Sequence, residues 1–155
     1  MRKALAVVMA IFFVAAAGCS HKGGSVSVDV DKAADKFIAG IKFSDQMSAV
    51  DEKTAQRLFA LEDGEAVKMK VYESSGATAE EVAVFEAKDA DSAEKIRDAA
   101  ETRIADQRDA FQSYQPKEMT KLKAPVLEVK GNYVFLCVSD DNSAAEKLIG
   151  EITGQ

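Results

Sequence analysis

The chain has 155 residues, with 20 lysines and arginines against 26 aspartates and glutamates, and a formal net charge of −6. This length suits one domain preceded by a targeting segment. The acidic balance argues against nucleic acid as a partner, because phosphates need cationic side chains, and against electrostatic adhesion to anionic lipid. Solubility is the simplest role of the excess negative charge.

The first nineteen residues, MRKALAVVMAIFFVAAAGC, have the layout of an export signal. Arg2 and Lys3 precede an uncharged apolar stretch, residues 4–15, which is shorter than the roughly 20 residues of a membrane-spanning helix. Small residues then lead to Cys19, as in a bacterial lipobox, although Ala16 stands where leucine is usual. The pattern favours a lipoprotein signal peptide, with an ordinary secretory signal or an uncleaved anchor helix as the alternatives.

The predicted domain organisation is a lipoprotein signal peptide (residues 1–18), a flexible tether (19–28) and a single folded domain (29–155). Cleavage before Cys19 removes two positive charges and leaves a net charge of −8. We expect lipid on Cys19 to hold the protein at the extracytoplasmic face of the cell membrane, since each buried methylene contributes about 0.8 kcal/mol of membrane affinity. The only histidine, His21, falls in the tether, so the folded domain contains none.

Two helices are predicted at the start of the domain. In residues 30–43, apolar side chains recur at three- and four-residue spacing, and Asp31 is a suitable start. A shorter helix is predicted over residues 51–61, where Asp51 can act as the N-cap.

The hydrophobic period then changes from that of a helix to that of a strand. In residues 65–73, Val67, Met69 and Val71 alternate with polar or longer side chains, which predicts a strand with one face on the core. Residues 80–87 predict a second strand.

The second half of the domain repeats the pattern of helix and hairpin. Residues 89–114 predict the longest helix, with capping-box spacing at Asp91 and Glu94. Residues 124–141 contain two apolar strands around a Gly-Asn turn, and a terminal helix is predicted from Ser143. We therefore predict an α+β fold. It has a mainly antiparallel sheet of about four strands in two hairpins, helices packed on one face, and an N-terminal helical segment.

The segment SSGAT, residues 74–78, joins the first two predicted strands. It lacks the glycines, lysine and following helix of a phosphate loop, and its serines do not lie between two glycines as in a nucleophile elbow. A Ser-His-Asp triad is excluded by the missing histidine, whereas a serine–lysine pair stays open. We interpret the segment as a hairpin connection with positive φ at Gly76. Its residues Ser74, Ser75, Gly76 and Thr78 are the first candidates for contacting a ligand or partner.

Cys137 lies in the apolar run YVFLCV and has no partner once Cys19 carries lipid. We predict a buried core residue, because a reactive thiolate needs a nearby cation or histidine. We expect no metal and no cofactor: the paired aspartates lack the spacing of a calcium loop, and two of the pairs suit helix starts.

Several segments occur together in an order that resembles a known family. They are the lipobox, SSGATAEEVAVFEAKDADSAEK, a long helix ending in Tyr-Gln-Pro, and the hairpin KGNYVFLCVSDD. Over roughly residues 28–152 they resemble small lipoproteins of Gram-positive, clostridia-type bacteria, catalogued as the domain of unknown function numbered 4358. The resemblance implies a surface lipoprotein and supplies no activity, cofactor or catalytic residue.

Three functions are compatible with these features. The anchor, the tether and the lack of a catalytic set favour a tethered, non-enzymatic binding or interaction module with an unidentified envelope partner or ligand. The first alternative is an accessory subunit of a larger membrane machine. The second is an envelope hydrolase that uses Glu73, Glu80 or Glu81, which requires a cleft holding a carboxyl group with a raised pKa.

Overall fold

The structure, a computed structural model, describes residues 26–154. The predicted signal peptide, Cys19 and most of the predicted tether lie outside the described residues. The elements follow in the order α1 (Val30–Gly40), β1 (Ser48–Ala49), α2 (Glu52–Leu58), β2 (Ala66–Glu73), β3 (Glu81–Ala87), α3 (Ala90–Tyr114), η1 (Pro116–Glu118), α4 (Met119–Lys123), β4 (Val126–Lys130), β5 (Tyr133–Val138) and α5 (Asn142–Thr153).

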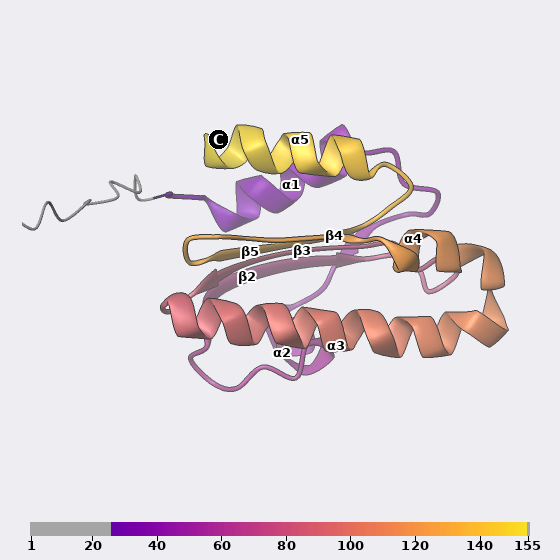
Figure 1. Ribbon diagram of the computed structural model, residues 1–155, viewed down its shortest axis with the longest axis horizontal. Helices are drawn as coiled ribbons and strands as arrows, with labels where there is room; N and C mark the ends of the chain where they lie inside the picture. Colours follow the sequence, from indigo (N-terminus) through magenta and orange to yellow (C-terminus); the bar gives the residue numbers. More distant parts are fainter. Residues whose placement is uncertain (1–25, 155) are drawn as a thin grey trace, which may run out of the picture.

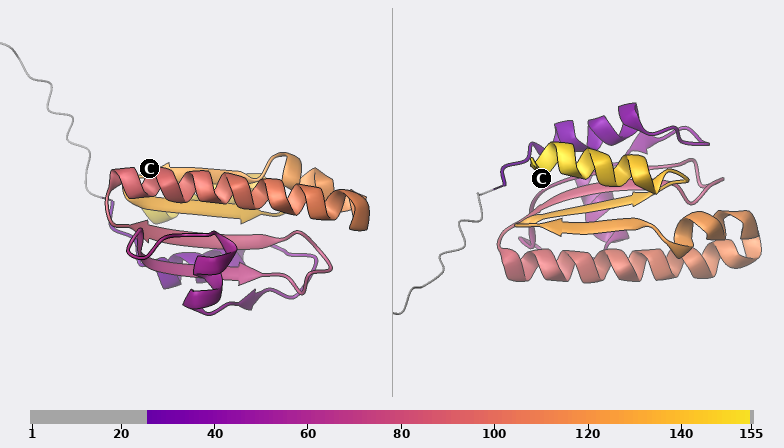
Figure 2. Two further views of the ribbon diagram at one scale, coloured as in Figure 1. Left: turned by 90° about the horizontal axis from the view of Figure 1, so that it is seen from below. Right: turned by 45° about the horizontal axis from the view of Figure 1, so that its top comes forward.

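The strands form one antiparallel sheet in the order β1-β2-β3-β5-β4. Helices α1 and α5 cover one face of this sheet, and α2 and α3 cover the other (Figure 1). On the second face, α2 lies over the β2 side and α3 over the β5 and β4 side (Figure 2). The predicted α+β class and the two hairpins are confirmed. The sheet has a fifth, two-residue strand, and the helices occupy both faces where one was predicted.

Both faces are covered because the central strands are apolar on both sides. In β3, Val82 and Val84 point into the core under α1 and α5, whereas Ala83 and Phe85 point into the core under α2 and α3. Alternate residues of a strand point to opposite faces, so a strand whose two sets are both apolar needs cover on each side.

Edge strand β2 shows why alternation alone misplaces a side chain. Val67, predicted to face the core, is 63% exposed. The pairing with β3 shifts between Ala66 and Lys68, and such a bulge interrupts the alternation of faces. Beyond the bulge, Met69 and Val71 pack in the core as predicted.

Four helices (α1, α2, α3 and α5) begin after an aspartate whose carboxylate accepts a backbone N–H three residues further along. These N-caps are Asp29, Asp51, Asp89 and Asp141. The N-cap role of Asp51 was predicted, and Asp89 and Asp141 belong to the two aspartate pairs that were expected at helix starts. The starts predicted at Asp31, Asp91 and Ser143 each lie two residues beyond the observed N-cap, inside the first turn of the helix.

Candidate functional site

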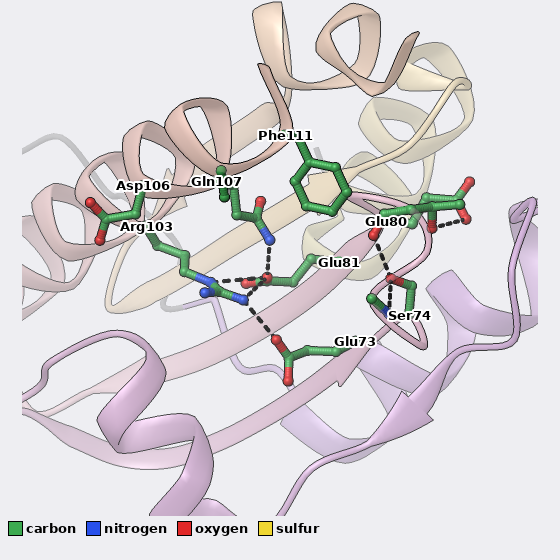
Figure 3. Close-up of a pocket in the computed structure, with 11 residues that line it drawn as sticks. Glu73, Ser74, Glu80, Glu81, Arg103, Asp106, Gln107 and Phe111 are labelled. Carbon is green, nitrogen blue, oxygen red and sulfur yellow. Dashed lines mark hydrogen bonds and ion pairs between the residues drawn. The ribbon is translucent and has the colours of Figure 1, made fainter. Parts of the chain in front are cut away.

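A cavity of about 340 Å³ lies where the β2–β3 connection meets the C-terminal half of α3. Its walls come from the adjoining ends of β2 and β3, from the connecting loop and from one side of α3 (Figure 3). The lining residues are Glu73, Ser74, Gly76, Thr78, Glu80, Glu81, Arg103, Asp106, Gln107, Ala110 and Phe111. The volume is at the lower end of the range for small-molecule sites.

Glu81, the first residue of β3, is fully buried at the centre of this site. Its Oε2 accepts hydrogen bonds from Arg103 Nε at 3.1 Å, from Arg103 Nη2 at 2.9 Å and from Gln107 Nε2 at 2.7 Å. Arg103 Nη2 also donates to Glu73 Oε1 at 2.7 Å. A continuous polar chain therefore joins β2, α3 and β3 along the cavity wall (Figure 3).

This chain holds two carboxylates against one guanidinium. Burial raises the pKa of Glu81, and the attraction and hydrogen bonds of Arg103 oppose that shift without cancelling it. The carboxylate of Glu73 adds to the rise, and the hydrogen bond from Gln107 opposes it. The condition set for a functional carboxyl, a raised pKa inside a cavity, is thus met by Glu81.

Two acceptor atoms at this wall have no hydrogen-bond partner: Glu81 Oε1 and Gln107 Oε1, both buried. The orientation of the Gln107 amide follows from its contact, because its nitrogen is the atom able to donate to Glu81 Oε2. An unsatisfied buried acceptor costs about 1–3 kcal/mol. Both residues line the cavity, so a bound molecule that donates to these oxygens would offset that cost.

The loop at the rim of the cavity is held by a carboxylate from outside the hairpin. The backbone N–H of Ser75 donates to Asp45 Oδ2 at 2.9 Å, and its hydroxyl donates to the same oxygen. Ser74 Oγ donates to the carbonyl of Thr78 at 2.6 Å, and Gly76 has a φ of +90°. The hairpin interpretation of SSGAT is confirmed, and both serine hydroxyls are engaged in holding the turn.

These contacts bear on a possible serine nucleophile. The hydrogen bond from the Ser75 hydroxyl holds the pKa of Asp45 below its usual range, so this carboxylate is a weak base. Two lysines of the neighbouring strand β2, Lys68 and Lys70, are the candidates for a serine–lysine pair, but they contact Asp31 and the ring of Tyr72 instead. Neither serine is therefore placed beside a base that could activate it.

Glu80, the neighbour of Glu81, belongs to a second buried cluster behind the rim. Lys121 Nζ lies 3.1 Å from Glu80 Oε1 and 2.9 Å from Glu118 Oε2. The Glu80 carboxylate also accepts the backbone N–H groups of Ser44 at 2.9 Å and Asp45 at 3.0 Å. Both oxygens of Glu80 are thus occupied by the protein itself.

The charges of this cluster are stabilised by their contacts. Burial alone would raise the pKa of Glu80, but hydrogen bonds from Ser44, Lys121 and Asp45 outweigh it and lower the pKa. Burial alone would lower the pKa of Lys121, but Glu118 and Glu80 raise it. The cluster ties the segment before β1, the hairpin loop and α4 into one frame around the cavity.

The predicted site residues are partly brought together. Of the four candidate contact residues, Ser74, Gly76 and Thr78 line the cavity, while Ser75 lies on its outer side against Asp45. Glu73, Glu80 and Glu81 all reach the lining.

Cys137 is a free, buried cysteine as predicted, and burial raises the pKa of its thiol to about 12. Such a thiol is almost entirely protonated at neutral pH and is a poor nucleophile. The predicted lipidation site, Cys19, lies outside the described residues.

Sequence reasoning missed the contribution of α3 and α4 to the site. Arg103 and Asp106 lie in a stretch of α3 so rich in charge that its sequence alone indicates a solvated face, and Lys121 lies between Pro116 and Pro125, where no helix was predicted. A signal was present at Gln107, because this amide occupies an apolar helical stripe between Ile104 and Phe111. A polar residue at such a position predicts a buried hydrogen-bond partner.

Within residues 26–154, no three side chains of the metal-binding types lie close enough to hold an ion. In the same part of the chain, no helix is both long and apolar enough to cross a membrane.

The fold and site together define an α+β domain with a polar cavity at one end of an antiparallel sheet. The family model described as "Domain of unknown function (DUF4358)" matches residues 39–139, which contain the sheet, the hairpin loop and all of α3. The chain belongs to this family. Searches of curated proteins and of solved structures each found no match.

Proposed function

We propose that this protein is a lipid-anchored, non-enzymatic binding module at the extracytoplasmic face of the cell membrane, and that the cavity beside α3 is its ligand site. The observation that carries the ligand site is the pair of buried, unpartnered oxygens on Glu81 and Gln107 at the cavity wall. The export signal and the cysteine that ends it support the anchored location.

A carboxylate-dependent hydrolase is the second candidate, and one observation favours it: the raised pKa of Glu81 inside a cavity. The other carboxylates fit this role less well. Glu80 has both oxygens occupied, and Glu73 is paired with Arg103. A general base or nucleophile must reach the reacting atoms, so these engaged side chains support binding over turnover.

An accessory subunit of a membrane machine is a form of the same proposal, with a protein in place of a small ligand. Crosslinking in intact cells of the native host distinguishes the two. A stoichiometric envelope protein recovered with the anchored chain, and lost with Cys19→Ala, favours the accessory role.

Replacing Cys19 by alanine is expected to move the protein from the membrane fraction to the soluble fraction. Two acyl chains hold a protein stably, and without the cysteine no thiol is available for lipid at this position. Fractionation followed by immunoblotting measures the change, with Cys137→Ala as the matched control because that cysteine is buried in the core. Retention of Cys19→Ala at the membrane, with the signal peptide still attached, would instead support an uncleaved anchor.

Filling the cavity is expected to abolish ligand binding while the fold is kept. Ala110 is exposed on α3 and lines the cavity, so Ala110→Trp places an indole at its mouth. Ala105 is exposed on the same helix and does not line the cavity, which makes Ala105→Trp the matched control. Native mass spectrometry of protein isolated from the host should show a bound small molecule in the wild type and the control, and at least a tenfold lower occupancy in Ala110→Trp.

Equal occupancy in Ala110→Trp and Ala105→Trp would place any ligand elsewhere, and ligand-free wild-type protein would contradict the proposed site. Prolonged incubation separates the two candidate activities. A binding module returns the molecule unchanged, whereas a hydrolase returns its products, and that production should stop in Glu81→Gln.

A further inference from the structure

We infer that the ligand of this cavity carries a protonated amine, and that its ammonium group lies against Glu81 and Gln107. This inference rests on the proposed function, because it names the chemical class that the same cavity would take. Three properties of the lining support it: the hydrogen-bonding atoms left unused, the balance of charge and the apolar wall.

Most side-chain hydrogen-bond donors that line the cavity are already engaged, and Arg103 Nη1 is the exception. The hydroxyl of Ser74 donates to the carbonyl of Thr78, the hydroxyl of Thr78 donates to Glu80, and the N–H of Gly76 donates to Ser74 Oγ. At the floor, Arg103 and the Gln107 amide donate to the carboxylates described above.

Two buried acceptor oxygens of the lining residues are also without a hydrogen-bond partner. Glu81 Oε1 and Gln107 Oε1 are acceptors without a donor, and both belong to residues at least nine-tenths buried. A ligand that satisfies them has to donate. An ammonium group carries three N–H donors and no acceptor, so it can serve both oxygens at once.

The charge of the lining favours a cation in the same place. Even without Glu81, whose pKa burial raises, the acidic lining residues Glu73 and Asp106 outnumber Arg103, the basic lining residue. The charge of Glu80 is balanced separately by Lys121. The lining is therefore negative overall, and a partly enclosed site strengthens both attraction for a cation and repulsion of an anion.

Phe111 supplies an apolar wall beside these polar atoms (Figure 3). An aromatic ring accommodates the carbon skeleton of a ligand and adds attraction for a cation within about 6 Å of its face. The volume of about 340 Å³ restricts the ligand to a small molecule. Because the acceptors require hydrogen-bond donors, a primary ammonium group fits these residues better than a quaternary ammonium group, which has none.

The test uses four probes that share one skeleton: 2-phenylethylamine, its N,N,N-trimethyl derivative, 2-phenylethanol and 3-phenylpropionate. They are titrated into the full mature chain carrying Cys19→Ala, which keeps every cavity residue, with amide NMR signals reporting location and calorimetry reporting affinity. We expect 2-phenylethylamine to shift the side-chain amide of Gln107 and the backbone amide of Thr78. Its affinity should be at least tenfold above that of each other probe.

Two substitutions locate the effect. Glu81→Gln keeps the shape of the side chain and removes its charge, so the affinity for 2-phenylethylamine should fall at least tenfold. Glu146→Gln is the matched control, because Glu146 is exposed on α5, on the other face of the sheet. Thermal unfolding confirms that each variant is folded, and the comparison among probes on the unsubstituted cavity does not depend on any variant.

The outcomes distinguish failure of the amine inference from failure of the proposed ligand site. If 2-phenylethanol or 3-phenylpropionate shifts the cavity signals at equal or higher affinity, the amine inference is overturned and the ligand site stands. Equal binding of the trimethyl derivative overturns the requirement for N–H donors. If no probe shifts these signals, the inference fails, and native mass spectrometry with Ala110→Trp decides independently whether the cavity is a ligand site.

Discussion

Replacing Lys121 by methionine should lower the free energy of unfolding by about 3–5 kcal/mol at pH 7, the range found when one partner of a buried ion pair is removed. The side chains of Lys121, Glu80 and Glu118 are 4%, 1% and 6% exposed. Methionine fills much of the same volume but leaves two buried carboxylates without their cation. Chemical denaturation of the wild type and the variant measures the difference.

Lys123→Met is the matched control for this substitution. Lys123 is exposed in the same short helix, so its removal should change the free energy of unfolding by less than about 0.5 kcal/mol. Equal effects at both positions would show that the buried cluster does not hold the frame.

The pH dependence of Lys121→Met follows from the lowered pKa of Glu80. A carboxyl with a lower pKa in the folded protein stabilises the fold above its unfolded value of about 4.3. That contribution is lost as the pH falls through the lower folded value. Protonation of Glu80 also removes the charge that Lys121 balances. The difference in free energy of unfolding between the wild type and Lys121→Met should therefore become smaller at acidic pH.

Arg103→Met is expected to cost about 3 kcal/mol at pH 7, because it leaves Glu81 buried without its guanidinium. For this variant, the raised pKa of Glu81 sets the sign of the pH dependence of stability. The folded protein retains a proton on Glu81 that the unfolded chain has lost, so stability falls as the pH rises from about 4.3 through the folded value. Removing Arg103 extends the pH range over which stability falls to higher values. The difference in free energy of unfolding between the wild type and the variant should therefore grow with pH.

A second substitution tests the assigned cause. Adding Glu81→Gln to Arg103→Met removes the unbalanced charge, so the double variant should regain most of the lost stability at pH 7. Arg97→Met is a suitable control, because Arg97 forms its ion pairs on the exposed side of the same helix. A deficit that is independent of pH, or that Glu81→Gln does not relieve, would contradict the role given to Arg103.

The elements of the fold could be predicted because their signals are local. The change of period near residue 65, the Gly-Asn turn before β5 and the acidic helix starts all depend on neighbours in sequence. The distribution of helices between the two faces could not be predicted in the same way. It depends on which apolar set of β3 each helix covers, and that is settled by contacts between segments far apart in the chain.

The same distinction between local signals and long-range contacts applies to the candidate site. The loop SSGAT and the three glutamates around it could be identified as candidates, and most of them line the cavity. Arg103 could not be distinguished from its exposed neighbours, because only the packing of α3 against β3 turns it toward Glu81. Lys121 was missed for a related reason. The segment after Pro116 folds as α4 and buries the Lys121 ammonium group, which is neutralised by Glu118 nearby in sequence and by Glu80 far from it.

A crystal structure of the protein isolated from its host, without exchange of bound molecules, tests the ligand site most directly. The expected result is density for a small molecule in the cavity, with a donor atom about 2.7–3.2 Å from Glu81 Oε1 and from Gln107 Oε1. Ordered water alone on both oxygens, in a cavity otherwise filled with solvent, would contradict the proposal that this cavity holds the ligand.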